Sequence, residues 1–250
     1  MKRLIAALLL SATPMLTGPA MAFDISAMSD AEKQDFGAAV REYLMANPQV
    51  LIESINELEN RQAEQTAQND VDLVAENHDA IFDDGHSWVG GNPDGDLTMV
   101  EFMDYRCGVC RQFNEEVKNA VAADGNIRLI IKEFPILGQD SEASSRFAIA
   151  AKQLGGDEAY AKAHDILMEL RTPASEDALR KVAGQIDLDA DQVIARMTSD
   201  EVTDVLNKNR SLGNTMAVQG TPTFIIGETV LRGVPRAGVA ATIEQIRDTM

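Results

Sequence analysis

The sequence predicts an α/β protein with one mixed sheet, a long helical insertion within it and a separate α-helical segment before it. Strand-like and helical patterns alternate from about residue 86 onward. Residues 141–216 are helical in pattern with no strand between them, and two amphipathic stripes lie in residues 28–65. Strands separated by helices imply a sheet covered on both faces.

The chain begins with the features of an export signal. Lys2 and Arg3 precede a short apolar run, and the small-x-small motif "AMA" ends at Ala22. The run is well short of the roughly 20 residues that a membrane-spanning helix needs. We therefore expect residues 1–22 to be a signal peptide cleaved after Ala22. The mature protein is expected outside the cytoplasm, without stable membrane insertion.

The charge excludes some classes of partner. The formal net charge is −18 at pH 7, and removing the two cations of the leader, which carries no acid, leaves −20. Such acidity disfavours nucleic acid and anionic membrane surfaces as partners.

Residues 23–65 are predicted to form a segment of two helices. "SDAE", from Ser29 to Glu32, has capping-box spacing, and Asn47 and Pro48 separate the two helices. The apolar stripes consist of Phe36, Val40, Tyr43, Leu44, Leu51, Ile52, Ile55 and Leu58. A unit this short does not bury both stripes on itself. We favour self-association of this segment over its packing on the chain's own main domain.

A polar tract, Glu59–Asp70, follows the second stripe. It favours a helix but has no apolar face, and "VDLVAENHDAIF" continues the helix by a turn or two. We expect the polar tract to be a solvated connector, residues 66–85 to be a helical linker and residues 86–250 to be the main domain.

The main domain alternates strands and helices. "HSWVGG" is a short strand, "LTMVEFM" is a buried strand ending near Met103, and "NIRLIIKEF" is a second strong strand closed by Pro135. The helical block 141–216 breaks at "GGDE", "RTPA" and "DLDA". Two strands, "TPTFIIG" and "ETVLRG", and a final helix complete the domain.

The only two cysteines, Cys107 and Cys110, stand where a strand turns into a helix. A structural zinc site needs four ligands, whereas His78, His86 and His164 are scattered, so we assign no metal site and no role to them. A disulfide across a four-residue loop would stabilise the fold by only about 2 kcal/mol. A purely structural disulfide therefore explains little.

Redox exchange explains the cysteine pair best. Unpaired backbone N–H groups and the helix dipole favour a thiolate at Cys107, and Arg106 adds positive charge beside it. Cys110 lies one turn further in, shielded but close enough to resolve a mixed disulfide. We expect the pair itself to be the redox centre, with no further cofactor.

The arrangement of strand, CxxC, helix and a distant Thr-Pro before a strand resembles the thioredoxin fold. The helical insertion resembles the DsbA-like periplasmic branch, whose motifs look like "EFMDYRCGVC", "KEFPILG" and "VQGTPTFIIG" within residues 86–250. "REYLMANPQVLIESINELENRQ" resembles the oligomerisation segment of the suppressor-of-copper-sensitivity protein C (ScsC) family. The resemblance implies a periplasmic homo-oligomer, with a trimer favoured.

The resemblance also implies roles for further residues. Thr221-Pro222 would be a cis-proline loop facing the cysteines, where Gly220 and Thr221 bind a substrate strand. Glu101 would be a buried acid that moves protons to and from the resolving thiol, with Lys132 as its partner. The alternative is that Glu101 and Lys132 form a structural or exposed pair.

The resulting expectation is thiol–disulfide exchange on exported proteins, as a disulfide isomerase or reductase reset by a membrane redox partner. Gly108 and Val109 supply no histidine of the kind that DsbA has between its cysteines, which disfavours a strongly oxidising potential. A DsbA-type oxidase is the alternative within the class. A Cu(I)-binding or copper-delivery protein is the alternative of another class, because soft thiolates suit Cu(I).

Overall fold

The computed structural model describes residues 27–249 and divides into two units, Met1–Glu59 and Asn60–Met250. The predicted signal peptide, residues 1–22, lies outside the described residues. None of the helices within residues 27–249 combines the length and the apolar composition needed to span a bilayer.

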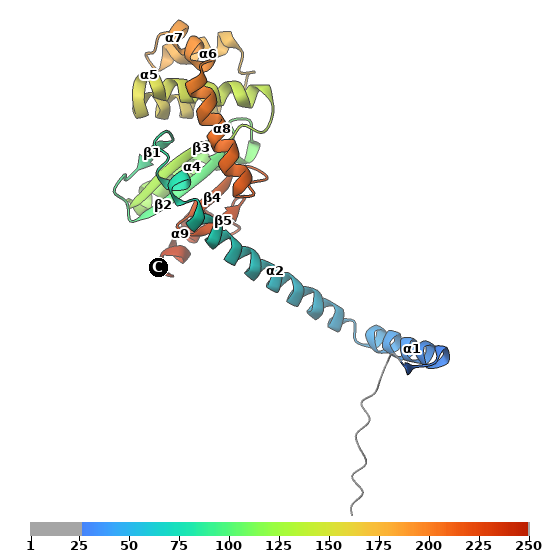
Figure 1. The fold of residues 1–250 in the computed structure, drawn as a ribbon. Coiled ribbons are helices and arrows are strands. Elements are labelled where there is room, and N and C mark those ends of the chain that lie inside the picture. The colour runs from blue at the N-terminus through green and yellow to red at the C-terminus, as the bar shows by residue number, and fades with distance from the viewer. Residues whose placement is uncertain (1–26, 250) are drawn as a thin grey trace, which may run out of the picture. The chain divides into compact units, whose positions relative to one another are not determined.

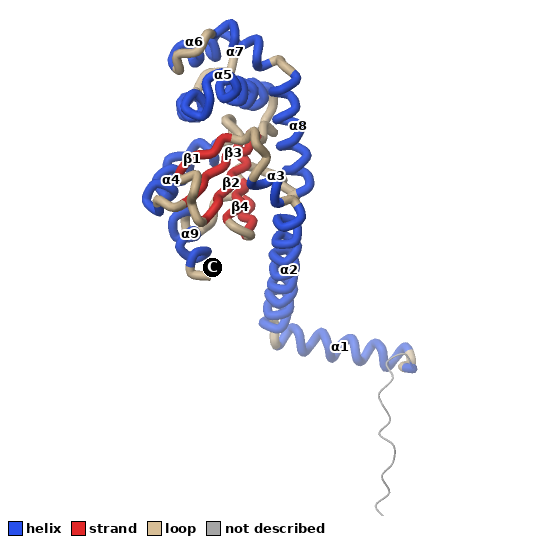
Figure 2. Tube along the Cα trace, turned by 60° about the vertical axis from the view of Figure 1, so that its left-hand side comes forward, coloured by secondary structure: helices blue, strands red, loops and turns tan. Residues whose placement is uncertain are grey.

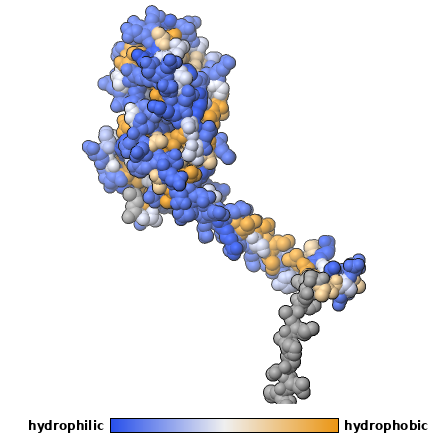
Figure 3. Space-filling view, viewed as in Figure 1, coloured by the Kyte–Doolittle hydropathy of each residue, from blue (hydrophilic) through white to orange (hydrophobic). Residues whose placement is uncertain are grey.

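The first unit contains α1 (Asp30–Ala46) and the start of α2 (Gln49–Glu76). The predicted capping box is present, because the Glu32 backbone N–H donates to Ser29 Oγ and the Ser29 N–H donates to the Glu32 carboxylate at 2.8 Å. The predicted apolar stripes are largely on the surface (Figure 3). The exposed large apolar side chains here are Phe36, Val40, Tyr43, Met45, Leu51, Ile52, Ile55 and Leu58.

The C-terminal part of α2 belongs to the second unit and packs on it. Arg232 donates from both terminal nitrogens to the two carboxylate oxygens of Asp70, each at 2.7 Å, and Val74 is buried. The expectation of a solvated connector over Glu59–Asp70 is therefore wrong at its last residue, which is buried. Asp70 finds a bidentate partner on an edge strand, and an apolar face begins just beyond the polar tract.

A five-stranded sheet forms the centre of the second unit (Figure 1). In spatial order its strands are β1 (Trp88–Gly91), β3 (Ile127–Glu133), β2 (Leu97–Met103), β4 (Thr223–Ile226) and β5 (Thr229–Arg232). β2 and β3 are parallel and the other pairs are antiparallel, so the sheet is mixed, as predicted. The parallel pair places the carboxyl ends of β2 and β3 side by side.

Each face of the sheet carries its own hydrophobic core. Side chains alternate between the faces along a strand, so Met99, Glu101 and Met103 share one face while Val100 and Phe102 share the other. The first core packs under α4 (Gly108–Asp124), α5 (Gln139–Glu169) and α9 (Val239–Arg247). The second core packs under α2, α3 (His78–Phe82) and α8 (Asp200–Thr215). Figure 2 shows α4 and α9 on one side of the sheet and α3 and α8 on the other.

The helical insertion consists of α5, α6 (Glu176–Gln185), α7 (Ala190–Met197) and α8, and its ends lie close to the predicted ones. The expected break at "GGDE" is a kink within α5 at Gly156, whose φ of 73° is a conformation that glycine tolerates. The breaks at "RTPA" and "DLDA" fall between helices. The helices α6, α7 and α8 begin at side-chain caps, which are Ser175, Asp189 and Ser199, respectively.

Candidate active site

The two cysteines lie where β2 leads into α4. Cys107 is the N-cap of α4, and the Cys110 backbone N–H donates to Cys107 Sγ at 3.4 Å. Both are free thiols, and their residues are 7% and 1% exposed, respectively. The residue at the helix start is thus the more exposed of the two, although both residues are buried.

A cis-proline loop faces Cys107, as expected. The Thr221-Pro222 peptide bond is cis, and the Cys107 thiol donates to the Thr221 carbonyl oxygen at 3.1 Å. The Thr223 hydroxyl donates to the Gly220 carbonyl at 2.9 Å and so ties the loop to the start of β4. The backbone at Thr221 is therefore within reach of whatever binds the attacking sulfur.

Glu101 is buried on the same face of the sheet as Cys110. Burial raises the pKa of Glu101 to about 8. Burial also raises the pKa of the Cys110 thiol, and the negative charge of Glu101 raises it further. Glu101 therefore influences the protonation of Cys110, the thiol that the resemblance assigned it to serve.

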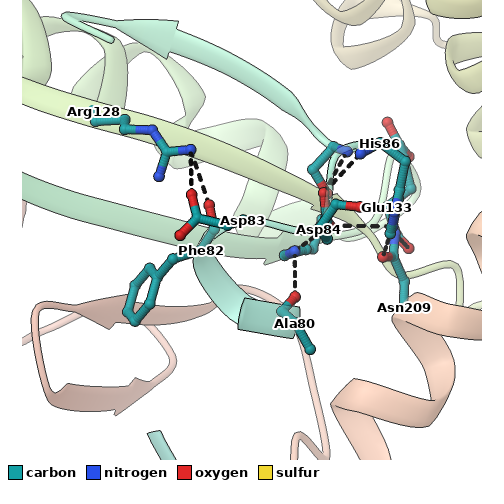
Figure 4. Close-up of polar contacts among 10 residues, drawn as sticks. Ala80, Phe82, Asp83, Asp84, His86, Arg128, Glu133 and Asn209 are labelled. Atoms are coloured by element: carbon teal, nitrogen blue, oxygen red, sulfur yellow. Dashed lines mark hydrogen bonds and ion pairs between the residues drawn. The ribbon is translucent and has the colours of Figure 1, made fainter. Parts of the chain in front are cut away.

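Lys132 does not pair with Glu101, so that prediction is wrong. Phe102 is the neighbour of Lys132 across the parallel strands, whereas Glu101 is level with Ile131, so the two side chains point to opposite faces. The Lys132 ammonium forms an ion pair with Asp84 and donates to the Ala80 carbonyl at 2.8 Å (Figure 4).

The Lys132–Asp84 pair belongs to a polar cluster beside the second core. Burial alone would raise the pKa of Asp84, but the charge of Lys132 and hydrogen bonds from Lys132 and Ser87 outweigh it and lower the pKa to about 2. Burial lowers the pKa of Lys132, and Asp84 opposes this effect. His86 contacts Asn209 at 3.2 Å, and Asn209 donates to the Glu133 backbone carbonyl at 3.1 Å (Figure 4). The cluster thus joins α8, the turn after α3 and β3.

Arg106 makes its hydrogen bonds to the helical insertion. Its guanidinium donates to the carbonyls of Leu170 at 3.0 Å and Thr172 at 2.9 Å. Arg111 donates to Leu167 and Leu170 carbonyls as well. α5 has no basic residue in its own last turn, and cations stabilise a helix C-terminus. The expectation placed the Arg106 charge at the sulfur, whereas its contacts hold the insertion against the active-site segment.

Sequence reasoning missed Asp104, which joins the loops at the carboxyl ends of β2 and β3. One carboxylate oxygen accepts from the Arg106 N–H at 2.7 Å, and the other accepts from the N–H groups of Ile136 and Leu137 at 2.8 and 3.1 Å. An acid directly after a buried strand was the available signal, because Asp side chains bind nearby backbone N–H groups in turns.

Sequence reasoning also missed a second buried acid, Glu133, and assigned no role to His164. Both belong to a hydrogen-bonded cluster with Tyr105 and Tyr160 beneath the active-site segment. An acid at the end of a mostly apolar strand was the available signal for Glu133. Nothing in the spacing of His164 indicated that it lies there.

The chain matches two protein families. Residues 83–245 match the thioredoxin family, and residues 32–65 match the N-terminal domain of the copper resistance protein ScsC. These two matched ranges correspond to the catalytic part of the chain and to the segment with exposed apolar stripes.

Several solved structures are similar. A thioredoxin-like oxidoreductase from Silicibacter pomeroyi is 35% identical, with a TM-score of 0.62, 68% of this chain covered and 95% of that one. Proteus mirabilis ScsC in a transitional conformation is 25% identical, with a TM-score of 0.62 and coverages of 90% and 97%. The thiol–disulfide exchange protein α-DsbA2 from Wolbachia pipientis, 24% identical with a TM-score of 0.66 and coverages of 73% and 96%, shows the same fold.

Among curated proteins, the Na⁺/H⁺ antiporter NhaA 1 of Salinispora arenicola is 25% identical over 139 residues. The match covers 55% of this chain but only 21% of that protein's length. The thioredoxin match alone spans more than half of the chain. The chain therefore belongs to the thioredoxin family, and a segment that matches the ScsC N-terminal domain precedes the matched domain.

Proposed function

We propose that this protein performs thiol–disulfide exchange on exported proteins in the periplasm, through Cys107 and Cys110, as a disulfide isomerase or reductase. The observation that carries the proposal is the pair of free thiols at the start of α4. One sulfur lies against the cis-proline loop, and the other is buried where Glu101 acts on it. The features of an export signal in residues 1–22 support the location.

The first chemical step is attack by the Cys107 thiolate on a substrate disulfide. A bond forms between Cys107 Sγ and one substrate sulfur, the substrate S–S bond breaks, and the other substrate sulfur leaves as a thiolate. The backbone N–H groups at the start of α4 favour negative charge on Cys107 before the attack. The backbone at Thr221 is placed to pair with the substrate segment beside the mixed disulfide.

The second step releases the substrate by one of two routes. In isomerisation, another substrate thiolate attacks the substrate sulfur of the mixed disulfide, and Cys107 leaves as a thiolate. In reduction, Cys110 attacks Cys107 Sγ, its proton passes to Glu101, and the substrate leaves with both electrons as a thiolate. The Cys107–Cys110 disulfide is then reduced by an electron donor, for which we propose a membrane redox partner.

The surface around the sulfur suits unfolded substrates. Val109, Ile136 and Leu137 are exposed large apolar side chains. Asp104 fixes the backbone of the last two next to the active-site segment. Exposed apolar side chains beside a reactive group favour chains that have not yet buried their own apolar residues.

A full-length Cys110→Ala protein tests the proposal. Without the resolving thiol, the mixed disulfide persists, so incubation with scrambled ribonuclease should give covalent adducts that a reductant releases. Cys107→Ala is the matched control and should give none. Absence of adducts with Cys110→Ala, under conditions where both proteins are folded, would contradict exchange as the function.

Two alternative functions have their own tests. A DsbA-type oxidase would show a reduction potential of about −120 mV in equilibrium with glutathione. An isomerase or reductase should have a clearly more negative potential. The second alternative is copper delivery, because residues 32–65 match a domain of the copper resistance protein ScsC. A Cu(I) titration tests it. Tight Cu(I) binding by the two thiols together with a failure to trap substrate would support copper delivery instead.

A further inference from the structure

Beneath the active-site segment lies a line of hydrogen-bonded side chains that the exchange mechanism does not use. Glu133, the last residue of β3, has its Oε1 at 2.9 Å from the Tyr105 hydroxyl oxygen, and the same Oε1 accepts from the Tyr160 hydroxyl at 2.6 Å. The Tyr105 hydroxyl also lies 3.2 Å from His164 Nδ1, and His164 Nε2 lies 3.2 Å from Asn114 Oδ1. All but Asn114 are buried.

The partners at the two ends restrict where the protons lie. Asn114 Oδ1 only accepts, so His164 Nε2 must donate to it. With a neutral imidazole, Nδ1 then accepts from the Tyr105 hydroxyl. The Tyr105 oxygen must in turn accept from Glu133, which requires a proton on the carboxyl group.

A second arrangement satisfies the same contacts with the proton at the opposite end. If His164 carries protons on both nitrogens, Nδ1 donates to the Tyr105 oxygen, and the Tyr105 hydroxyl donates to a Glu133 carboxylate. The two arrangements differ by a concerted shift. The carboxyl proton passes to the Tyr105 oxygen while the hydroxyl proton of Tyr105 passes to Nδ1.

We propose that Glu133 and His164 share one proton through the Tyr105 hydroxyl, and that this shared proton holds the segment before Cys107 in its active position. Glu133 is then a positioning residue for the exchange reaction, and this part of the inference rests on the proposed function. Tyr105 stands two residues before Cys107, and its carbonyl accepts from Arg111 Nε at 2.6 Å.

The surroundings favour the arrangement with the proton on Glu133. Burial raises the pKa of Glu133 to about 7, although the two tyrosine hydroxyls oppose the rise. Burial lowers the pKa of His164 to about 4. The other titratable groups that act on this pair or on its tyrosines are Glu101, Asp104, Lys118 and Asp165.

Loss of the shared proton has a structural consequence. The Tyr105 hydroxyl has one proton, so it donates either to the Glu133 carboxylate or to His164 Nδ1, and the other acceptor loses this donor. A buried acceptor without a donor is destabilising. The hydrogen bonds of Tyr105 that fix the active-site segment should therefore weaken as the pH rises through about 7, the pKa of Glu133.

The test compares Glu133→Gln and Tyr105→Phe with the wild-type full-length chain. A glutamine amide does not ionise, and its NH2 group in the place of Oε1 donates to the Tyr105 oxygen as the protonated acid does. At pH 6 the glutathione exchange rate of Glu133→Gln should lie within about twofold of wild type, whereas Tyr105→Phe should lose about three- to tenfold. Between pH 6 and 8 wild type should show an inflection, beyond the ionisation of Cys107, that Glu133→Gln lacks. Identical pH profiles for wild type and Glu133→Gln would overturn the positioning role.

A second readout does not depend on activity. Nitrogen-15 NMR of the His164 ring in the reduced wild-type chain should show the Nε2–H tautomer or the imidazolium at pH 6. A neutral Nδ1–H tautomer would overturn the shared proton. If wild type exchanges with glutathione but the tautomer is wrong, only this inference fails. If wild type does not exchange at all, the proposed function fails while the NMR result still decides the shared proton.

Discussion

Glu101 and Cys110 are both shielded from water on the same face of the sheet, and the charge of Glu101 raises the pKa of Cys110. Cys110 has to lose its proton when it attacks Cys107, and bulk water does not reach it readily. A nearby carboxylate is therefore the group best placed to accept that proton. The two cysteines are therefore activated differently. The backbone N–H groups at the start of α4 stabilise the Cys107 thiolate, whereas Glu101 accepts the proton of Cys110.

Replacing Glu101 should slow the second step and spare the first. In Glu101→Gln the resolution of a mixed disulfide by Cys110 should slow by at least about tenfold, the lower range of a lost general base. Attack by Cys107 on a peptide disulfide should change little. Stopped-flow measurement of the two phases checks this, with the exposed Glu115→Gln on α4 as the matched control. Equal slowing of both phases would contradict the assigned role.

The buried carboxyl of Glu101 should also make stability depend on pH. Its pKa is raised from an ordinary value of 4.5 to about 8 in the folded protein. The folded state thus binds the proton more tightly, and its stability contribution is complete below about pH 4.5 and lost as the pH rises through about 8. At pH 9, with the thiols kept reduced, Glu101→Gln should exceed wild type by on the order of 5 kcal/mol in the free energy of unfolding.

Urea denaturation at pH 5 and pH 9 measures this difference. Glu133 contributes in the same direction between about pH 4.5 and 7, so the comparison uses Glu101→Gln against wild type at each pH rather than wild type alone. A stability advantage of Glu101→Gln that is as large at pH 5 as at pH 9 would show that ionisation is not its cause.

At the scale of elements, the predictions succeeded where a pattern lies within one segment. The strands around Val100 and Ile130 are rich in apolar residues, and the breaks in the helical block follow from glycine, proline and capping residues. Predictions failed where two segments had to be placed against each other. Lys132 was given the wrong partner because the register of β2 and β3 decides which side chains share a face. Asp70 was expected in solvent because its partner Arg232 is 162 positions away.

The same limit applied to the site. The cysteine pair and the proline of the Thr221-Pro222 loop belong to local motifs that are recognisable without a structure. Tyr105, Glu133 and His164 come from three separate elements and meet only in the folded chain. An isolated tyrosine or histidine in the sequence carries no sign of such a neighbour.

The ion pair of Lys132 should be structural and not catalytic. Asp84→Ala leaves a buried ammonium without its counter-ion and should destabilise the fold by about 3 kcal/mol or more. The matched control is Asp83→Ala, which removes a largely exposed carboxylate that pairs with Arg128. Thermal unfolding of both variants measures the effect. Because Lys132 lies on the face opposite Glu101, the folded fraction of Asp84→Ala should keep its exchange rate, and a loss there would contradict this assignment.

At the scale of the whole molecule, the exposed apolar stripes in the first unit are the feature that calls for a partner. No residue of α1 is buried within residues 27–249, and contiguous exposed apolar side chains mark interaction sites. The match of residues 32–65 to the ScsC N-terminal domain favours self-association, for which we propose a trimer. Several active sites facing one shared space would let a substrate released by one cysteine pair meet another.

Removing residues 23–65 should separate the two activities. The shortened chain keeps Asp70 and its contact with Arg232, so the second unit should stay folded. It should sediment as a monomer and still reduce insulin, but lose the ability to reshuffle scrambled ribonuclease. Full-length Ile55→Asp, compared with Glu53→Asp on the same helix, tests the interface with a single change. A monomer that reshuffles as well as the full chain would contradict the role of assembly.

In the proposed mechanism Cys107 attacks the substrate disulfide, and the buried Cys110 reacts only with the resulting mixed disulfide. The most direct test of this mechanism is limited alkylation of the native, reduced, full-length chain with iodoacetamide at pH 7, followed by mass-spectrometric mapping. We predict that iodoacetamide modifies Cys107 first and that it modifies Cys110 only after unfolding. Modification of Cys110 as fast as Cys107, or no modification of Cys107 before unfolding, would contradict it.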